Sequence, residues 1–182
     1  MRLWSKYSLI ALLTVISSSA GIAGEWHASV TGKSQGKFPG AAKGSPHAGK
    51  IPVLTFDYEL KAPRDIATGQ TTGKRQHKPI RIIKEWDATT PMFLTGIVNG
   101  ETLTEVVLEY WEEDDSGEKV MTFKITLTDC LVTTAAQGDP VHGVDVKLGA
   151  KMQEIIEMTY STLDFEHLQS KKTIRDAWPT GR

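Results

Sequence analysis

Residues 69–87, GQTTGKRQHKPIRIIKEWD, change character twice along their length. The stretch opens with glycines and threonines, becomes basic, and then alternates apolar and polar residues as far as Trp86. Three interpretations fit such a composition: a nucleic-acid-binding patch, a phosphate-binding loop, or a loop that leads into a β-strand. The choice between them decides the class of fold and of function.

The phosphate-binding loop fails on spacing. Gly69 and Gly73 lie too close together, and Lys74 is followed by Arg75 where that motif requires Ser or Thr. The nucleic-acid patch fails on charge and composition. The whole chain has a net charge of −1, and no aromatic residues are interleaved with the basic ones to stack on bases. The stretch is therefore predicted to be a loop followed by a strand.

Apolar–polar alternation of the same kind recurs along the chain and predicts further strands. We expect strands within residues 25–32, 51–62, 77–86, 103–111 and 120–138. The strand at 51–62 should turn its aromatic side chains inward, and the one at 120–138 should bend into a second strand. Residues 151–169 are expected to form two strands with a kink near Ser161. Residues 33–50, 63–76 and 139–150 are predicted to be loops, and the tail after residue 169 is polar with Trp178 as its anchor.

One short helix is predicted between residues 87 and 100. Thr89 or Thr90 is the expected N-cap and Pro91 the first helical residue, while Asn99-Gly100 ends the helix. The expected apolar face consists of Met92, Phe93, Leu94 and Ile97. Together these patterns predict an all-β sandwich or barrel of about eight strands with one short helix.

The first 23 residues have the layout of a cleavable secretory signal peptide. A charged start precedes an apolar run at 7–16, which falls short of the ~20 residues that a membrane-spanning helix needs. We expect residues 24–182 to form a single domain with 19 basic and 22 acidic residues, a net charge of −3. The predicted location is secreted, either extracellular or periplasmic.

The residue types that carry catalysis occur without the required arrangement. None of the five histidines has a partner at metal-ligand spacing, and each is interpreted as a solvated or strand-face residue. Cys130 is expected to be a small buried hydrophobic residue. The acidic run at 112–115 is expected on a hairpin tip. We therefore predict no enzyme activity, no catalytic or metal-binding residues, no cofactor, and neither nucleic acid nor a small-molecule substrate as partner.

The loop before the strand is the predicted functional element. It is long for a connection within a compact domain, and loops of that length often carry function. Its charges have both signs, which suits contact with the acidic turn of another copy. The residues predicted to form an assembly interface are Pro63, Arg64, Asp65, Thr72, Gly73, Lys74 and Arg75.

The same region resembles a known family. The stretch APRDIATGQTTGKRQHKPIRIIKEWDATTP, residues 62–91, resembles the central signature of the haemolysin-coregulated protein (Hcp) family. The matching residues are Arg75, His77, Pro79 and Ile80, then Lys84, Asp87, Thr89, Thr90 and Pro91. The closing strands of the family are matched by Glu154, Ile156, Tyr160 and Leu163, and its short end by Trp178. The resemblance covers roughly residues 26–178.

The resemblance implies a two-sheet β-barrel with one flanking helix, and a structural role. Hcp proteins form six-membered rings that stack into the inner tube of the bacterial type VI secretion system, which is propelled with a spike and carries small effectors in its lumen. The expected partners are thus further copies, spike and sheath components, and small effectors. Typical tube subunits assemble in the cytoplasm, so cytoplasmic assembly before export is expected if residues 1–23 are not a working signal. The alternative is an exported Hcp-like β-barrel that acts as a binding or adhesin-type module outside a contractile machine.

Overall fold

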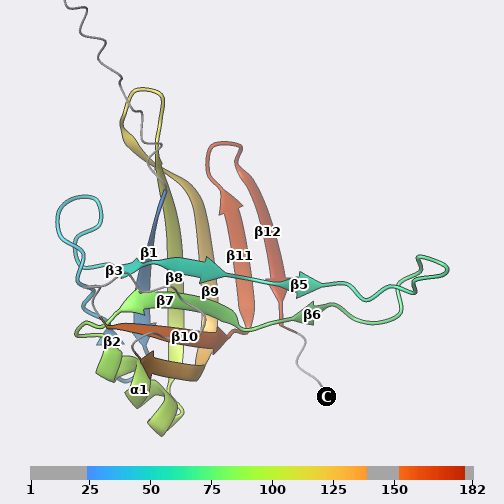
Figure 1. Ribbon diagram of the computed structural model, residues 1–182, viewed down its shortest axis with the longest axis horizontal. Coiled ribbons are helices and arrows are strands. Elements are labelled where there is room, and N and C mark those ends of the chain that lie inside the picture. Colours follow the sequence, from blue (N-terminus) through green and yellow to red (C-terminus); the bar gives the residue numbers. More distant parts are fainter. Residues whose placement is uncertain (1–23, 139–151, 179–182) are drawn as a thin grey trace, which may run out of the picture.

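The computed structural model describes residues 24–138 and 152–178 and shows a mainly β protein with one helix in those ranges (Figure 1). The predicted fold class is confirmed. The strands are β1 (Glu25–Gly32), β2 (Gly36–Lys37), β3 (Ile51–Val53), β4 (Thr55–Asp57), β5 (Leu60–Lys61), β6 (Gln76–His77), β7 (Ile80–Glu85), β8 (Thr102–Glu113), β9 (Lys119–Gly138), β10 (Gln153–Thr159), β11 (Thr162–His167) and β12 (Lys172–Ala177), and the helix is α1 (Thr90–Asn99). No helix in the described ranges is long and apolar enough to cross a membrane.

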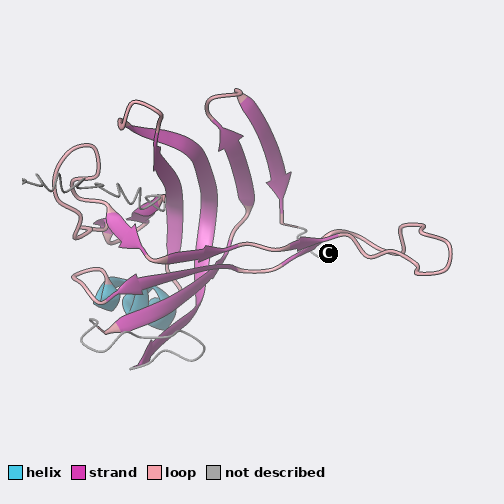
Figure 2. Ribbon diagram, turned by 45° about the horizontal axis from the view of Figure 1, so that its top comes forward, coloured by secondary structure: helices cyan, strands magenta, loops and turns pink. Residues whose placement is uncertain are grey.

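Antiparallel pairing joins most of these strands into one strongly curved sheet of order β2-β1-β8-β9-β10-β7-β4. One layer contains β1, β8 and the start of β9, and β11 and β12 extend it from β9. The second layer contains β7 and β10 with the end of β9. The consecutive strands β3 and β4 pair with β1 and β7 respectively, which brings the two ends of the sheet together around a common core (Figures 1 and 2).

The long strand β9 belongs to both layers because it bends at Asp129, a non-glycine residue with φ 49°. Up to residue 131 it pairs with β8, and its residues 123–128 also pair with β11. From residue 131 onward it pairs with β10. The predicted bend is confirmed, but it does not divide the segment into two strands, since pairing with β8 continues past it to Leu131.

The core lies between the layers. It takes the inward side chains of the alternating strands, of which Ala28, Val30, Ile82, Leu108, Leu127 and Ile156 are fully buried. Burial of each large aliphatic side chain contributes roughly 1.5–3 kcal/mol. Phe38, from the loop after β2, is also buried and meets Phe93 of α1 edge-on, with ring centroids 5.2 Å apart. Cys130 is buried, as predicted, and burial raises the pKa of its thiol to about 12.

The helix ends where the sequence predicted, but its first residue is Thr90 and not Pro91. Thr89 is the N-cap residue, Pro91 lies in the first turn, and Gly100 ends the helix in the left-handed region with φ 60°. Phe93 is fully buried, but Ile97 is 38% exposed. The predicted apolar face is therefore wrong in part: Leu94 and Ile97 point partly to solvent, because the helix touches the barrel along a narrow strip centred on Phe93 and Gly96.

Two other strand predictions need correction. Residues 51–62 form three short strands instead of one, because the chain leaves β1 after Val53 and joins β7 at Thr55. This change of partner buries Val53 and leaves Leu54 49% exposed, against the predicted inward face. The polar tail contains a further strand, β12, which pairs with β11. These additional strands explain why the structure has more strands than the eight predicted. The loop predicted at residues 139–150 lies outside the described residues.

A buried ion network fixes α1 against the second layer. Lys84 of β7 and Glu154 of β10 are both fully buried, and their charged atoms lie 2.7 Å apart. The Lys84 ammonium also lies 2.9 Å from Asp87 and donates to the Glu85 carbonyl at 2.7 Å. Thr90, the first residue of α1, donates to the same Glu154 oxygen at 2.7 Å. The network therefore ties together two strands and the start of the helix.

Candidate assembly surface

A two-stranded arm projects from the barrel between β4 and β7. Its base is formed by β5 and β6, with Leu60 opposite His77, and a single bridge further out pairs Arg64 with Thr71. Figures 1 and 2 both show the loop beyond these strands extending far from the barrel. The arm therefore offers a large surface that its own barrel does not cover.

The tip of the arm is ordered by its own hydrogen bonds. One carboxylate oxygen of Asp65 accepts bonds from the Thr68 amide at 2.7 Å, the Thr68 hydroxyl at 2.9 Å and the Ala67 amide at 3.0 Å. These bonds, above all the one from the Thr68 amide, hold the pKa of Asp65 below its usual value. The outer strands are joined by the Thr72 amide, which donates to the Pro63 carbonyl at 3.0 Å. The loop thus has a defined shape before it meets any partner.

The base of the arm is anchored to the C-terminal strands. The buried His77 ring shares a 2.9 Å hydrogen bond with the Tyr160 hydroxyl and packs against Trp178, with ring centroids 5.4 Å apart. Burial raises the pKa of Tyr160, so its hydroxyl is a neutral partner in that bond. Asp176 of β12 lies 3.6 Å from His77 and accepts a 2.6 Å bond from Arg75. The prediction of Trp178 as an anchor is confirmed. Of the two interpretations of His77, the solvated one is wrong, because its ring on strand β6 is buried.

The predicted interface residues occupy both sides of this arm. Pro63, Arg64 and Asp65 lie on its outgoing side, and Thr72, Gly73, Lys74 and Arg75 lie on its returning side. All are exposed or half-buried. Arg75 differs from the others because its guanidinium is already paired with Asp176 of the same chain. Lys74, on the exposed outer part, is the better candidate for a charge that meets another molecule.

The arm carries one apolar side chain that the sequence analysis overlooked. Ile66, at the tip, is fully exposed. Its signal in the sequence is a single large aliphatic residue in the stretch PRDIATGQ, with no apolar–polar alternation around it. An exposed side chain of this size on a projecting, hydrogen-bonded tip favours a contact surface.

The acidic run lies where the sequence predicted, at the hairpin tip between β8 and β9. Glu112 and Glu113 end β8, and Asp114 closes the turn by accepting a 2.9 Å bond from the Ser116 amide and a 3.0 Å bond from the Glu118 amide. These bonds, with the Ser116 hydroxyl first, lower the pKa of Asp114. The tip is exposed and negatively charged, which makes it complementary to a basic segment.

Comparison with known proteins identifies the family to which this chain belongs. The family model described as "Type VI secretion system effector, Hcp" matches residues 28–167. The chain belongs to the Hcp family. A curated relative, the "Major exported protein" of Pseudomonas aeruginosa, is 28% identical over 134 residues, which are 72% of this chain and 77% of the relative.

Solved structures of the family share the fold. A crystal structure of an Hcp protein superposes with a TM-score of 0.78 at 21% identity, covering 87% of this chain and all of the other. The secreted protein Hcp3 from Pseudomonas aeruginosa superposes with a TM-score of 0.70 at 22% identity, again covering 87% of this chain and all of the other. The predicted family is thereby confirmed. The Hcp family is one of structural secretion proteins and not a family of enzymes.

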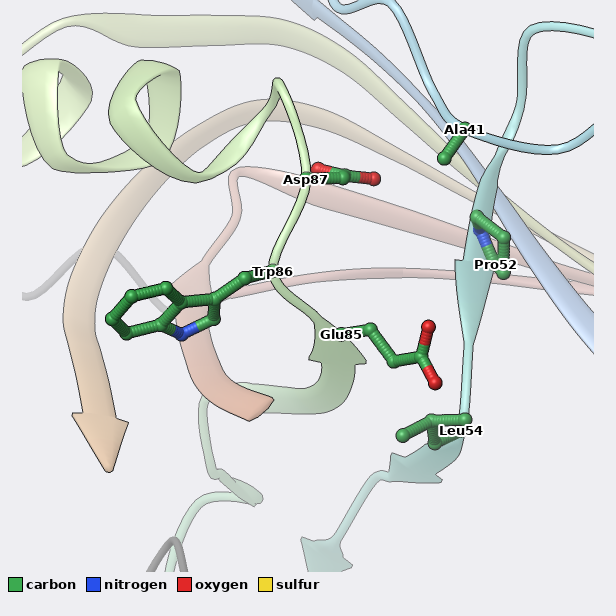
Figure 3. A pocket seen from close by; sticks show the side chains of 6 residues that line it. All are labelled: Ala41, Pro52, Leu54, Glu85, Trp86 and Asp87. Atoms are coloured by element: carbon green, nitrogen blue, oxygen red, sulfur yellow. The ribbon is translucent and has the colours of Figure 1, made fainter. Parts of the chain in front are cut away.

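Among the described residues of this Hcp chain, one pocket lies beside the second layer (Figure 3). It measures about 200 Å³ and is lined by Ala41, Pro52, Leu54, Glu85, Trp86 and Asp87. Asp87 is engaged by the Thr89 amide at 2.8 Å and by Lys84. Its pKa lies below the usual value because these bonds outweigh the opposing effect of burial. None of the lining residues is a serine, threonine, cysteine, lysine or histidine, so this pocket shows no pairing of a nucleophile with a histidine base.

A second group in the Hcp chain has the chemistry of a metal site. Ligand atoms of Glu25, His27 and His47 all lie within 4.8 Å of one another. The sequence analysis missed this group because His47 lies on a loop far from β1 in sequence. His27 is a strand-face histidine, as one of the two interpretations has it, although His47 covers its ring. The interpretation of His47 is wrong, because it lies on a loop and is buried.

Proposed function

We propose that this chain is a structural subunit of a type VI secretion tube. In this proposal six copies form a ring, rings stack into a hollow tube, and the lumen carries small effectors. Spike and sheath components are the further partners. The subunit has no catalytic step of its own.

The projecting arm is the observation that carries the proposal. It is clamped at its base by His77 and Asp176, shaped at its tip by Asp65, and covered by no other part of the described chain. An ordered arm with a fully exposed Ile66 suits insertion against a neighbouring copy. The exposed Lys74 and the acidic tip at Asp114 and Asp115 provide opposite charges for such a contact.

The test is the oligomeric state of the purified chain, measured by analytical ultracentrifugation over a range of concentrations. Wild-type chain is expected to sediment as a ring of six copies. Ile66→Asp should shift the distribution to monomers, because a buried isoleucine contributes roughly 1.5–3 kcal/mol per interface and a ring contains one such contact per subunit. Lys74→Glu should weaken the ring less, and wild-type association should weaken with salt.

Val98→Asp is the matched control, since Val98 is also a strongly exposed aliphatic residue but lies on α1. It should leave the ring intact, and circular dichroism should show that every variant is folded. Rings that persist in folded Ile66→Asp would reject the arm as the assembly element. A wild-type chain that stays monomeric at all concentrations would instead support the exported binding module.

A further inference from the structure

The outer face of β1 carries two potential ligands in register. Glu25 and His27 are two residues apart on one strand, so their side chains point to the same side, away from the core residues Trp26 and Ala28. The third residue, His47, lies on the loop that connects β2 to β3. Within residues 39–50 it is the one buried residue, so this otherwise exposed loop is attached to β1 at His47.

The two imidazoles are buried, and three of their four ring nitrogens have no hydrogen-bond partner in the described part of the chain. His27 and His47 are each 7% exposed, and their rings stack in parallel with centroids 4.0 Å apart and an angle of 4°. Nδ1 of His27 and both ring nitrogens of His47 are buried and make no hydrogen bond to another described residue. Buried polar atoms are nearly always satisfied, so three unsatisfied nitrogens at one place call for a ligand.

The charges around the group suit a cation. Two ion pairs surround the group: Lys119 lies 2.7 Å from Glu25, and Lys50 pairs with Glu109. These four charges cancel, so the site presents no net positive charge to an incoming ion.

We propose that Glu25, His27 and His47 bind a divalent transition-metal cation of the zinc class. Two imidazoles with one carboxylate are a ligand set that zinc accepts, with water completing its coordination. Ligands on one tetrahedral zinc lie roughly 3.3 Å apart, given bonds of about 2.0–2.1 Å. The separations here, at most 4.8 Å, therefore require only a small closure.

Metal binding must open the histidine stack. The lone pairs of a ring lie in its plane, so two parallel stacked rings cannot both point at one ion. Because His27 is held in β1, the expected movement is a tilt of His47 on its exposed loop. Lys119 must also give up part of its contact with Glu25. Trp111 packs edge-on against His47 at 4.9 Å between centroids and will report that tilt.

The test is calorimetric titration of ZnCl₂ into the untagged chain, with Co²⁺ absorption and tryptophan fluorescence as spectroscopic readouts. One Zn²⁺ should bind per chain, and Co²⁺ should give the visible bands of a low-coordinate site. His47→Gln and His27→Gln should each weaken binding by about tenfold or more. Lys119→Gln should tighten it by up to about fivefold, because the competing surface ion pair is lost.

His167→Gln is the matched control, since His167 lies at the end of β11, apart from the proposed site, and its ring hydrogen-bonds to the neighbouring Ser170. Its affinity for Zn²⁺ should equal that of the wild type. Absence of binding to the wild-type chain would overturn the proposal, as would binding that folded His47→Gln retains in full. Because His47 lies on a loop, that variant is informative even if His27→Gln fails to fold.

Discussion

Replacement of Lys84 by methionine tests whether the buried network determines the stability of the barrel. The cluster of Lys84, Asp87 and Glu154 has one positive and two negative charges, so the formal charge is −1 and becomes −2 in Lys84→Met. Methionine fills a similar volume, so the change is chiefly one of charge. It leaves two carboxylates without their cation, one of them on the fully buried Glu154.

We expect Lys84→Met to lower the free energy of unfolding by about 3–5 kcal/mol, the cost of breaking a buried pair from one side. At an m-value of about 2 kcal/mol/M, the urea midpoint should fall by roughly 1.5–2.5 M. Urea melts followed by circular dichroism at pH 7 provide the measurement. The loss should shrink at lower pH, because protonation of one carboxylate removes the repulsion that the substitution creates.

Companion variants distinguish charge from packing. Glu154→Gln keeps the pair of Lys84 with Asp87 and should cost only about 1–2 kcal/mol. Lys61→Met is the control, since Lys61 is exposed and its ion pair with Glu59 lies at the surface, so the substitution should change stability by less than about 0.5 kcal/mol. The reasoning is refuted if Lys84→Met stays within about 1 kcal/mol of the wild type, or if Glu154→Gln is the more damaging of the two.

Four further predictions concern other parts of the chain. Phe93→Ala should cost about 3–5 kcal/mol in urea melts, whereas Ile97→Ala, at a partly exposed position, should cost less than about 1.5 kcal/mol. The Cys130 thiol, with its pKa raised to about 12, should react with a disulfide reagent only as fast as the chain unfolds; rapid reaction of the folded chain would contradict its burial. Gly40→Ala should destabilise the loop by about 1–3 kcal/mol in thermal melts, because a Cβ atom there would lie 2.0 Å from the Lys50 backbone. Since the pKa of Asp87 is depressed in the folded chain, its stabilising contribution is present above the ordinary value near pH 4 and is lost as pH falls; acid titration of Asp87→Asn should show a shallower loss of stability than the wild type.

The alternating strands and the helix could be predicted from sequence because their signals are local. Val30, Leu108 and Leu127 lie on the buried side of clean period-two patterns, and Pro91 and Gly100 bracket the helix. The family signature was also visible in the sequence, but the contacts that its residues make in the folded chain were not. Lys84, Asp87 and Thr90 stand close together in sequence, yet the oxygen that joins Lys84 to Thr90 belongs to Glu154, on a strand that pairs with β7 from far along the chain.

The remaining features depend on contacts that no local pattern encodes. The change of partner at Leu54 reflects where β1 and β7 lie in space, and β12 forms because β11 offers it a free edge. The histidine pair arises because the loop after β2 folds back over β1. The sequence indicated that the seven predicted interface residues belong to one loop. Only the structure shows that Arg75 already pairs with Asp176 of the same chain and that Ile66 is fully exposed.

The bend in β9 has a consequence for how the chain folds. Because one uninterrupted strand supplies pairing edges to β8 and β11 before Asp129 and to β10 after it, neither layer can be completed without the other. Unfolding should therefore be a single cooperative transition, with no stable half-barrel along the way. β9 meets β8 across a short hairpin turn, but its other partners, β10 and β11, follow after longer stretches of chain, so loop closure onto β9 should be the slow step of refolding. The strands of the arm, β5 and β6, pair with each other and not with β9. The arm should therefore open first and exchange its amide protons far faster than the barrel does.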